Sequence, residues 1–503
     1  MRPVAFGLAA LVLSASVSSG QAPVHAAAAP LESNTPQANF EAFFAAYNEL
    51  LHAKQYDAIR EMTRMQRVPS NNYEARAMVA VMNASALIGL GRTEEAEELI
   101  NDAKRLAPNS PEPSRILWLS MLVIQRFDFA ADAFDRLLSK FPDVVRKLEW
   151  DHVRHLLRNQ PNGQDRRNAD RRIALAQIGF GGDTDRGHYL AENAVDLLVK
   201  RGDFRRAADL LPNVKQVDSI ENILIQKRFS PLWPHLERLV GANLNDFAEV
   251  SLAPAAQRYR KSPGDTEALN DYLRALHNAA RFRDAIALLA KLPKTSIEMA
   301  GADEDMGWAV NYVALALHRT GRADEADRLF ALLNDAPIQN GRRRISMKIN
   351  RLELLVSDGR FDKALPLLDV TEQSAKTEGN KYAQQVVRRL KYCTLVGVGR
   401  RDEAAILLAE LMTHTDDAPA ATIEALLCAG DLDGAEQLTL ATLTKKDWFP
   451  ERFVRQLQAK PLSSTDPSIW QARWKDLRAR PAIARAFDRL GRDMPEALLL
   501  TAQ

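Results

Sequence analysis

Apolar side chains recur along this 503-residue chain with the spacing of amphipathic helices, and short turns of repeated composition separate the apolar stretches. Residues 75–90 and 310–319 are typical of these stretches. The turn usually carries Gly and a charged residue, often followed by an aromatic, and leads to a small residue that opens a second helix. Nine copies occur, at 54–59, 91–96, 125–130, 202–207, 280–285, 321–326, 359–364, 399–404 and 430–435.

The spacing of these copies predicts an array of helix pairs. From the last residue of one copy to the last of the next, the steps are 37, 34, 77, 78, 41, 38, 40 and 31 residues. Periods of this size are typical of helical repeat arrays. The two long steps are each close to two units, so we expect degenerate helix pairs within 143–190 and 216–262.

The composition of the turn explains why it closes one helix and starts another. Gly supplies the left-handed conformation that ends the first helix, and acidic residues favour the first turn of the second. The small residue, usually Ala, lets the two helices approach closely. A larger apolar residue four positions later fills the groove between pairs; these residues are Ile100, Phe134, Leu211, Leu289, Phe330, Leu368 and Leu408.

The repeat resembles the tetratricopeptide repeat (TPR) family over roughly residues 37–445. Within Gly91–Pro108, Ala96, Ala103 and Pro108 stand at the family's spacing of two small residues and a helix-ending proline. The next copy matches through Phe127, Ala130, Leu137 and Pro142, whereas later copies lack the terminal proline or lengthen the pair. The resemblance implies an all-α, right-handed superhelical solenoid of antiparallel helix pairs, which a C-terminal helical cap would complete.

In TPR proteins the first helix of each pair lines a concave groove that binds segments of other proteins, and the resemblance implies the same use here. A protein or peptide is therefore the expected partner. The candidate groove residues on first helices are Asn83, Asn270, Arg274, Asn311, His318, Arg388 and Lys391.

Two segments depart from the repeat. Residues 226–234 hold two prolines around apolar residues, so we expect a fixed corner between helices. Residues 470–492 contain Trp470, Trp474 and Pro481 and are typical of a helical cap; a docking surface is the alternative for both segments. The predicted order is a signal peptide (1–26), a short linker (27–36), repeats (37–215), a proline-interrupted segment (216–265), further repeats (266–445) and the cap (446–503).

The N-terminus predicts export. Arg2 precedes an uncharged run from Val4 to Val17, and Val24-His25-Ala26 fits a signal-peptidase site, with a cut after Ala28 as the alternative. Residues 1–40 contain no cysteine for a lipid anchor, and no later stretch is long enough to span a bilayer. We therefore expect a periplasmic or secreted protein without an integral membrane segment after cleavage.

The charge balance indicates which partners to expect, and the cysteine content indicates whether a disulfide is expected. After removal of residues 1–26, 66 basic side chains face 65 acidic ones, which argues against nucleic acid as the partner. Cys393 and Cys428 lie on neighbouring first helices but differ by four residues in their distance to the following turn, an offset of about 6 Å. We expect two buried free thiols, with a disulfide as the alternative.

Catalytic motifs are absent from the sequence: it contains no HExxH, Walker, GxSxG or paired CxxC pattern. His152 and His155 have too few neighbouring ligands for a metal site, and we expect Gly179–Gly182 to be a loop. The clusters Arg166-Arg167, Arg171-Arg172 and Arg342-Arg343-Arg344 should form solvated faces, with contacts to an acidic peptide or a carboxylate as the alternative. We expect no cofactor, no bound metal and no catalytic residue.

These observations favour a non-catalytic scaffold or adaptor of the bacterial cell envelope. One alternative is an envelope enzyme, acting for example on peptidoglycan, whose catalytic module a solenoid supports. Only 58 residues follow position 445, too few for the separate lysozyme-like module of roughly 150 residues that such an enzyme needs. The other alternative is a structural component of an outer-membrane or secretion assembly, which would present a large apolar patch.

Overall fold

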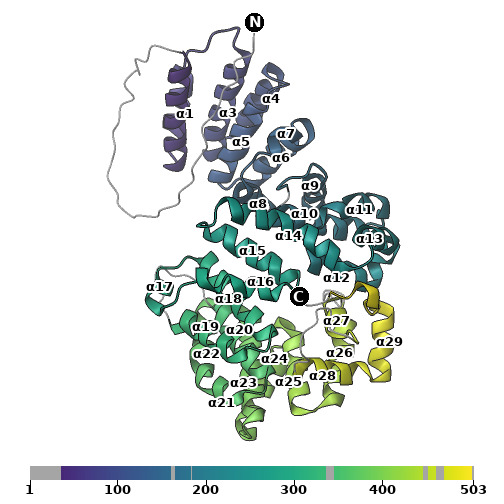
Figure 1. Ribbon diagram of the computed structural model, residues 1–503. Helices are drawn as coiled ribbons and strands as arrows, with labels where there is room; N and C mark the ends of the chain where they lie inside the picture. Colours follow the sequence, from purple (N-terminus) through teal and green to yellow (C-terminus); the bar gives the residue numbers. More distant parts are fainter. Residues whose placement is uncertain are drawn as a thin grey trace. The chain divides into compact units, whose positions relative to one another are not determined.

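The computed structural model describes residues 36–159, 165–182, 184–335, 345–445, 451–459 and 469–500 (Figure 1). Within these residues the regular structure is helical, apart from one isolated antiparallel bridge between Gln226 and Gly491. The predicted all-α array of helix pairs is confirmed. The predicted signal peptide and linker, Arg342–Arg344 and the side chain of Trp470 lie outside the described residues.

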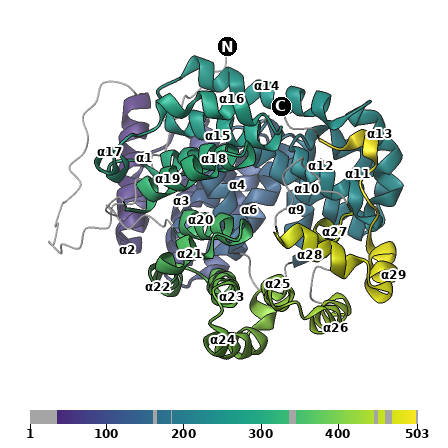
Figure 2. The ribbon, with the colours of Figure 1, turned by 60° about the horizontal axis from the view of Figure 1, so that its bottom comes forward.

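The chain divides into two compact units, residues 1–133 and 134–503 (Figures 1 and 2). The helices of unit 1 are α1 (Pro36–His52), α2 (Tyr56–Met65), α3 (Tyr73–Gly89), α4 (Thr93–Leu106) and α5 (Glu112–Val123), and α6 (Phe127–Lys140) runs across the division. Those of unit 2 up to residue 335 are α7 (Pro142–Val145), α8 (Trp150–Arg158), α9 (Asp165–Gln177), α10 (Asp185–Lys200), α11 (Phe204–Leu210), η1 (Leu211–Asn213), α12 (Val217–Ile225), η2 (Lys227–Leu232), α13 (Trp233–Val240), α14 (Leu244–Lys261), α15 (Thr266–Asn278), α16 (Phe282–Ala287), η3 (Leu289–Lys291), α17 (Ser296–Ala300), α18 (Glu304–Arg319) and α19 (Ala323–Asp335). The remainder are α20 (Ile345–Ser357), α21 (Phe361–Ala364), η4 (Leu365–Leu367), α22 (Leu368–Glu378), α23 (Lys381–Gly397), α24 (Arg401–Thr413), η5 (Thr415–Asp417), α25 (Pro419–Ala429), α26 (Leu432–Leu443), α27 (Glu451–Gln456), α28 (Ile469–Arg478), α29 (Pro481–Leu490) and η6 (Glu496–Leu498).

All nine turn copies share one backbone geometry. Their first residue has a positive φ, between 69° and 81° at the six glycines and at 55°, 61° and 53° in Lys54, Gln125 and Ala280. At Gly91 the N–H donates to Ile88 O (3.0 Å), and the next N–H, of Arg92, donates to Leu87 O (2.8 Å). The other eight copies repeat this Schellman pairing, which satisfies the last carbonyls of the first helix.

The packing positions of the repeat are also largely as the sequence predicts. The small residue that ends each copy is buried in every case: Ile59, Ala96, Ala130, Ala207, Ala285, Ala326, Ala364, Ala404 and Ala435. Four residues later, Leu289 and Leu408 are only half-buried, whereas the other five apolar residues are buried. Filling of the groove between pairs is therefore incomplete at η3 and α24.

The aromatic residue of the turn has a defined place against the next pair. The ring of Tyr56 lies against Gly89, where an added Cβ would come within 2.5 Å of the ring, and Phe361 lies in the same way against Gly397. A glycine near the end of the first helix thus makes room for the aromatic side chain of the preceding turn.

The C-terminal helices pack on two parts of unit 2 that are far apart in sequence. Helices α28 and α29 contact α25 and α26, while α27 and α29 also contact α12 and η2. Arg492 donates from Nε to Leu224 O (2.7 Å) and from Nη2 to Glu237 (2.8 Å), and its guanidinium lies 3.7 Å from the Trp233 ring centre. The segment 451–500 therefore closes unit 2 by joining its last repeat to α12–α13.

The proline-interrupted segment supplies the surface for this closure. Pro231 lies in η2 and Pro234 in the first turn of α13, and the indole Nε1 of Trp233 donates to Ile223 O (3.0 Å). Glu221, on α12, is buried and forms an ion pair with Arg455 of α27 (2.8 Å). Burial raises the pKa of Glu221, and Arg455 acts against that increase.

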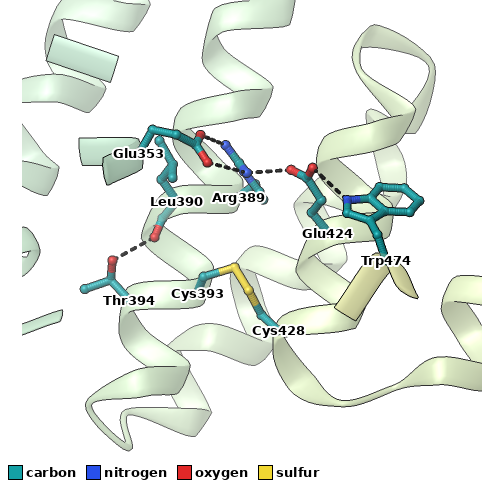
Figure 3. The surroundings of a disulfide bond; sticks show 8 residues. All are labelled: Glu353, Arg389, Leu390, Cys393, Thr394, Glu424, Cys428 and Trp474. Atoms are coloured by element: carbon teal, nitrogen blue, oxygen red, sulfur yellow. Dashed lines mark hydrogen bonds and ion pairs between the residues drawn. A yellow bond between two sulfur atoms is a disulfide. The ribbon is translucent and has the colours of Figure 1, made fainter. Parts of the chain in front are cut away.

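The expectation of two free thiols is wrong, because Cys393 and Cys428 form a disulfide with a Cα–Cα distance of 5.6 Å (Figure 3). They belong to α23 and α25, which place residues 35 apart side by side, whereas the turns that follow these helices are 31 apart. Aligning the helices by their turns therefore misplaces Cys428 by one helical turn.

One helical turn before each cysteine, a buried ion network joins the same helices. Arg389 is 3% exposed and pairs with Glu353 of α20 and with Glu424 of α25 (2.5 Å). Trp474 of α28 donates from Nε1 to Glu424 (3.2 Å; Figure 3). Burial alone would lower the pKa of Arg389, but the two carboxylates raise it above its ordinary value.

Candidate partner-binding cleft

A polar cleft of about 440 Å³ lies in unit 2, where the first helix α15 meets the N-terminal ends of α8, α10 and α18. It is larger than two other cavities of unit 2, which have volumes of about 40 and 10 Å³. Its walls hold charged, aromatic and small residues: Arg146, Leu148, Glu149, Trp150, Phe180, Gly181, Thr184, Arg186, Arg258, Glu267, Asn270, Asp271, Arg274 and Asp305.

Helix α15 supplies the floor of the cleft from a single face. Glu267, Asn270, Asp271 and Arg274 follow one another at spacings of three, one and three residues, which brings them onto one side of a helix. The opposite side carries Leu269, Leu273 and Leu276 into the core, and this division between polar and apolar sides orients α15.

Asp271 is the centre of the charged floor. Its carboxylate accepts from Arg258 Nη1 (2.8 Å), which lies on α14, and from Arg274 Nη2 (2.5 Å). Burial raises the pKa of Asp271, with Arg258 acting against the increase, and burial likewise lowers the pKa of Arg274. These pairs hold α14 and α15 together and keep the floor charged.

An aromatic pair forms the opposite wall. The rings of Trp150, at the start of α8, and Phe180, after α9, are stacked with their centres 6.1 Å apart. At the rim, Arg186 of α10 and Glu267 lie 4.0 Å apart, and Glu267 is 63% exposed on its side chain. The cleft thus offers one aromatic surface and a rim of charges of both signs.

Asn270 has an unusual position in this floor. It is 9% exposed, and its Nδ2 donates to Asp305 Oδ1 (2.9 Å) across to α18. Its Oδ1 is buried and has no hydrogen-bond partner among the described residues. A buried acceptor without a donor costs free energy, so this oxygen marks a position where a ligand's donor would be stabilised.

A smaller cavity of about 40 Å³ adjoins the cleft. The two share Arg258, Asp271 and Arg274, and the remaining wall of the smaller one is partly apolar, with Val217 and Ala248 among its residues. The paired arginines and Asp271 therefore stand between the main cleft and the smaller cavity.

The structure places two of the predicted groove residues, Asn270 and Arg274, in the cleft. Asn311 is 1% exposed and accepts from Asn350 Nδ2 (2.8 Å), so it lies in the core and cannot meet a partner. His318 bonds Asp358 (2.9 Å) beside a cavity of only about 10 Å³.

The other three predicted residues do not line the cleft. Arg388 donates to Gln385 (3.0 Å), Lys391 donates to Glu372 (2.6 Å), and both belong to α23. Asn83 is on α3 in unit 1, half-buried, with its Oδ1 unpaired among the described residues. One polar residue per first helix is thus a poor guide to a site that combines several elements.

Sequence reasoning missed Asp271, Glu267, Arg258 and the pair Trp150–Phe180. The polar stripe of α15 was a usable signal for Glu267 and Asp271, because four polar residues share the helix face that Asn270 and Arg274 define. The approach of α8 and α9 to α15 had no such signal, since they belong to the degenerate region between turn copies.

The other arginine and histidine clusters singled out in the sequence make structural contacts. The expectation of a solvated face is wrong for Arg171, which is 2% exposed and, as in the alternative, donates to a carboxylate, that of Asp135 (3.0 Å). His152 is half-buried, and burial lowers its pKa. The described residues contain no group of three or more His, Cys, Asp or Glu side chains that could hold a metal.

In the described part of the chain, every helix is too short or too polar to cross a membrane.

No protein-family model matches the chain. No curated protein matches it either. Among solved structures it is similar to the TPR domain of P58(IPK), at 14% identity over 70% of this chain and 97% of that chain, with a TM-score of 0.17. It is also similar to Naa15/Naa10 bound to HypK-THB (13% identity, 89% and 79% coverage, TM-score 0.23) and to a circular tandem repeat protein (13%, 89% and 93%, TM-score 0.14). With TM-scores this low, the similarity says nothing about how the pairs are arranged or what they bind.

Proposed function

We propose that this chain is a non-catalytic scaffold of the bacterial cell envelope that binds a segment of another protein in the cleft of unit 2. The observation that carries the proposal is the polar face of α15, which lines an open cleft with Glu267, Asn270, Asp271 and Arg274. First helices of repeat pairs are where a helical array presents residues to a partner.

The composition of the cleft favours a polypeptide over a small apolar ligand. Small-molecule pockets are lined mainly by apolar side chains, whereas eight of the residues around this cleft are charged. Arginine and aromatic residues are enriched where proteins contact one another, and Trp150 and Phe180 stand beside four arginines here.

Two features support the envelope as the compartment. The segment 1–26 has the composition of a secretory signal. The disulfide between Cys393 and Cys428 is of a kind that persists in oxidising compartments such as the periplasm.

A photo-crosslinking experiment tests both parts of the proposal. A photoreactive amino acid would replace Arg186, at the rim of the cleft, or Glu94, exposed on α4, in the full chain expressed with its signal segment. We expect the purified periplasmic fraction to contain the chain. The photoreactive residue at position 186 should form a protein adduct that mass spectrometry identifies, and the one at position 94 should not form this adduct.

The outcomes separate this proposal from its alternatives. Equal labelling from both positions, or no protein adduct from Arg186, would contradict a partner-binding cleft. Glycan adducts at Arg186 would instead favour an enzyme or binder of envelope polymers, and recovery of the chain only in the cytoplasm would reject the compartment.

A further inference from the structure

We infer that the cleft recognises a basic side chain, arginine or lysine, of the partner segment. This inference rests on the proposed function and adds to it the chemistry by which the partner is chosen. It follows from the pairing of the charges in the cleft and from the one buried acceptor among them.

The four arginines of the cleft already face carboxylates. Arg258 and Arg274 both donate to Asp271, and Arg186 lies 4.0 Å from Glu267. Arg146 pairs with Asp143, which lies outside the cleft lining. An incoming acidic side chain would have to compete with these carboxylates for every one of the arginines.

Two carboxylates have no such partner. Within the described residues neither Glu149 nor Asp305 forms an ion pair, although both line the cleft. Asp305 accepts one hydrogen bond, from Asn270 Nδ2. Glu149 and Asp305 are therefore the carboxylates of the lining without a cation at ion-pair distance, although Asp305 also acts to raise the pKa of Arg274, and a cation would be complementary to them.

The buried oxygen of Asn270 indicates where in the cleft the cation would bind. Because Asn270 Nδ2 is bonded to Asp305 Oδ1, the unpaired Asn270 Oδ1 and the carboxylate of Asp305 lie next to each other. A guanidinium or ammonium group carries several N–H donors and can serve both acceptors at once. A neutral N–H would satisfy Asn270 but would add no positive charge at Asp305.

The aromatic wall fits the same ligand. A cation gains attraction from the face of Trp or Phe within about 6 Å. Trp150 and Phe180 line the cleft together with Asp305 and Asn270. A basic side chain can thus contact both acceptors and aromatic carbon, as arginine does at protein interfaces.

Isothermal titration of the mature full chain tests this inference. The probes are three acetylated, amidated pentapeptides that differ only in the central residue, which is arginine, citrulline or glutamate. We expect the arginine peptide to bind at least about tenfold more tightly than the citrulline peptide, because hydrogen bonds to charged groups are stronger than those between neutral groups. The glutamate peptide should show no binding.

Matched variants locate the site. Asp305→Asn should weaken binding of the arginine peptide about tenfold. Glu149→Gln should weaken binding of the arginine peptide less. Because Glu149 is exposed, this variant still tests the site if the Asp305 variant misfolds. Glu94→Gln removes an equivalent charge on α4 and should leave binding unchanged.

Three results would overturn the inference: equal affinity for arginine and citrulline, preference for glutamate, or failure of a correctly folded chain to bind any of the peptides. Unchanged arginine binding in both Asp305→Asn and Glu149→Gln would also overturn it. The crosslinks at Arg186 decide independently whether the cleft holds a protein, so loss of the basic-residue preference leaves the scaffold proposal standing.

Discussion

Unit 1 and the closed end of unit 2 are built from the same kind of helix pair but are held together over different distances along the chain. In unit 1, α3 packs on α2, α4 and α5, its near neighbours in sequence. In unit 2, α27 and α29 return to α12 and η2, so that Arg492 bonds Leu224 across 268 residues. Figure 1 shows the two kinds of region, in purple to blue for unit 1 and in yellow beside teal for the closure.

This difference determines how far the effect of a change should reach. Repeats that touch only their neighbours lose stability locally, since each interface is an independent contribution. The closure in unit 2 ties α27 and α29 to α12 and η2, so a change at one junction should also loosen the other. Unit 2 should therefore be more sensitive than unit 1 to substitutions of equal chemistry.

Removal of an ion pair should give the largest difference between the two units in the loss of unfolding free energy. Replacing Arg389 by Ala leaves Glu353 and Glu424 without their cation inside the α20–α23–α25 junction, and we expect a loss of about 3 to 5 kcal/mol in the free energy of unfolding. The comparable variant in unit 1 is Arg92→Ala. It removes the exposed pair with Glu95 and should leave the free energy of unfolding nearly unchanged, because water and salt screen an exposed pair.

Urea denaturation followed by circular dichroism measures both variants. Similar losses in the two would mean that burial of the Arg389 network contributes nothing beyond a surface pair. A double variant in which Glu424→Gln accompanies Arg389→Met should recover part of the loss, because it removes one of the two uncompensated carboxylates.

The disulfide between Cys393 and Cys428 should have the next largest effect on the free energy of unfolding. Opening it, by Cys393→Ala with Cys428→Ala, should lower the free energy of unfolding by about 3 to 4 kcal/mol, the loop-closure entropy for the 35-residue separation. Dithiothreitol should lower the unfolding midpoint of the native chain to that of the double variant and leave the variant itself unchanged. An effect of dithiothreitol on the variant would show that the reagent acts elsewhere.

The closure of unit 2 by Arg492 should contribute somewhat less to the free energy of unfolding than the disulfide does. Arg492→Ala removes two hydrogen bonds and the contact with Trp233, and we expect a loss of about 2 to 3 kcal/mol. Hydrogen exchange should increase in α12 and α29 together. Arg489→Ala, an exposed change on α29, is the control. Faster exchange confined to α29 would refute the coupling of the two ends.

The sequence predicted those parts of the fold that depend on short-range rules. The turn copies predicted the left-handed position in all nine turns, because closure of a helix is decided within about six residues. The register of α23 against α25 was not predictable in this way, because it depends on packing between helices and not on the turns. The closure by Arg492 was missed for the same reason.

The candidate site was predicted only in part, again for a physical reason. Asn270 and Arg274 were found because they lie on a recognisable first helix. Trp150 and Arg258 come from α8 and α14, in the stretches without turn copies, where no repeating pattern indicates which side chains meet. A cleft formed by several elements needs the tertiary contacts that periodicity does not encode.

The smallest expected effects concern the turns, and here the two units should behave alike. Gly91 and Gly399 both have φ near 80°, both are exposed, and a Cβ at either would meet nothing within 4 Å. Replacement by Ala should therefore cost only the backbone strain, about 1 kcal/mol in each case. Gln125→Gly relieves the same strain at φ 61° and should stabilise unit 1 by up to about 1 kcal/mol.

Denaturation midpoints of the three variants sharpen the comparison between the units, because the change is chemically identical and only its surroundings differ. Equal losses for Gly91→Ala and Gly399→Ala would show that turn strain is local in both units. A clearly larger loss for Gly399→Ala would mean that strain at one turn passes through the disulfide-linked helices α23 and α25 to the closure. A destabilising Gln125→Gly would refute the strain explanation for the whole repeat.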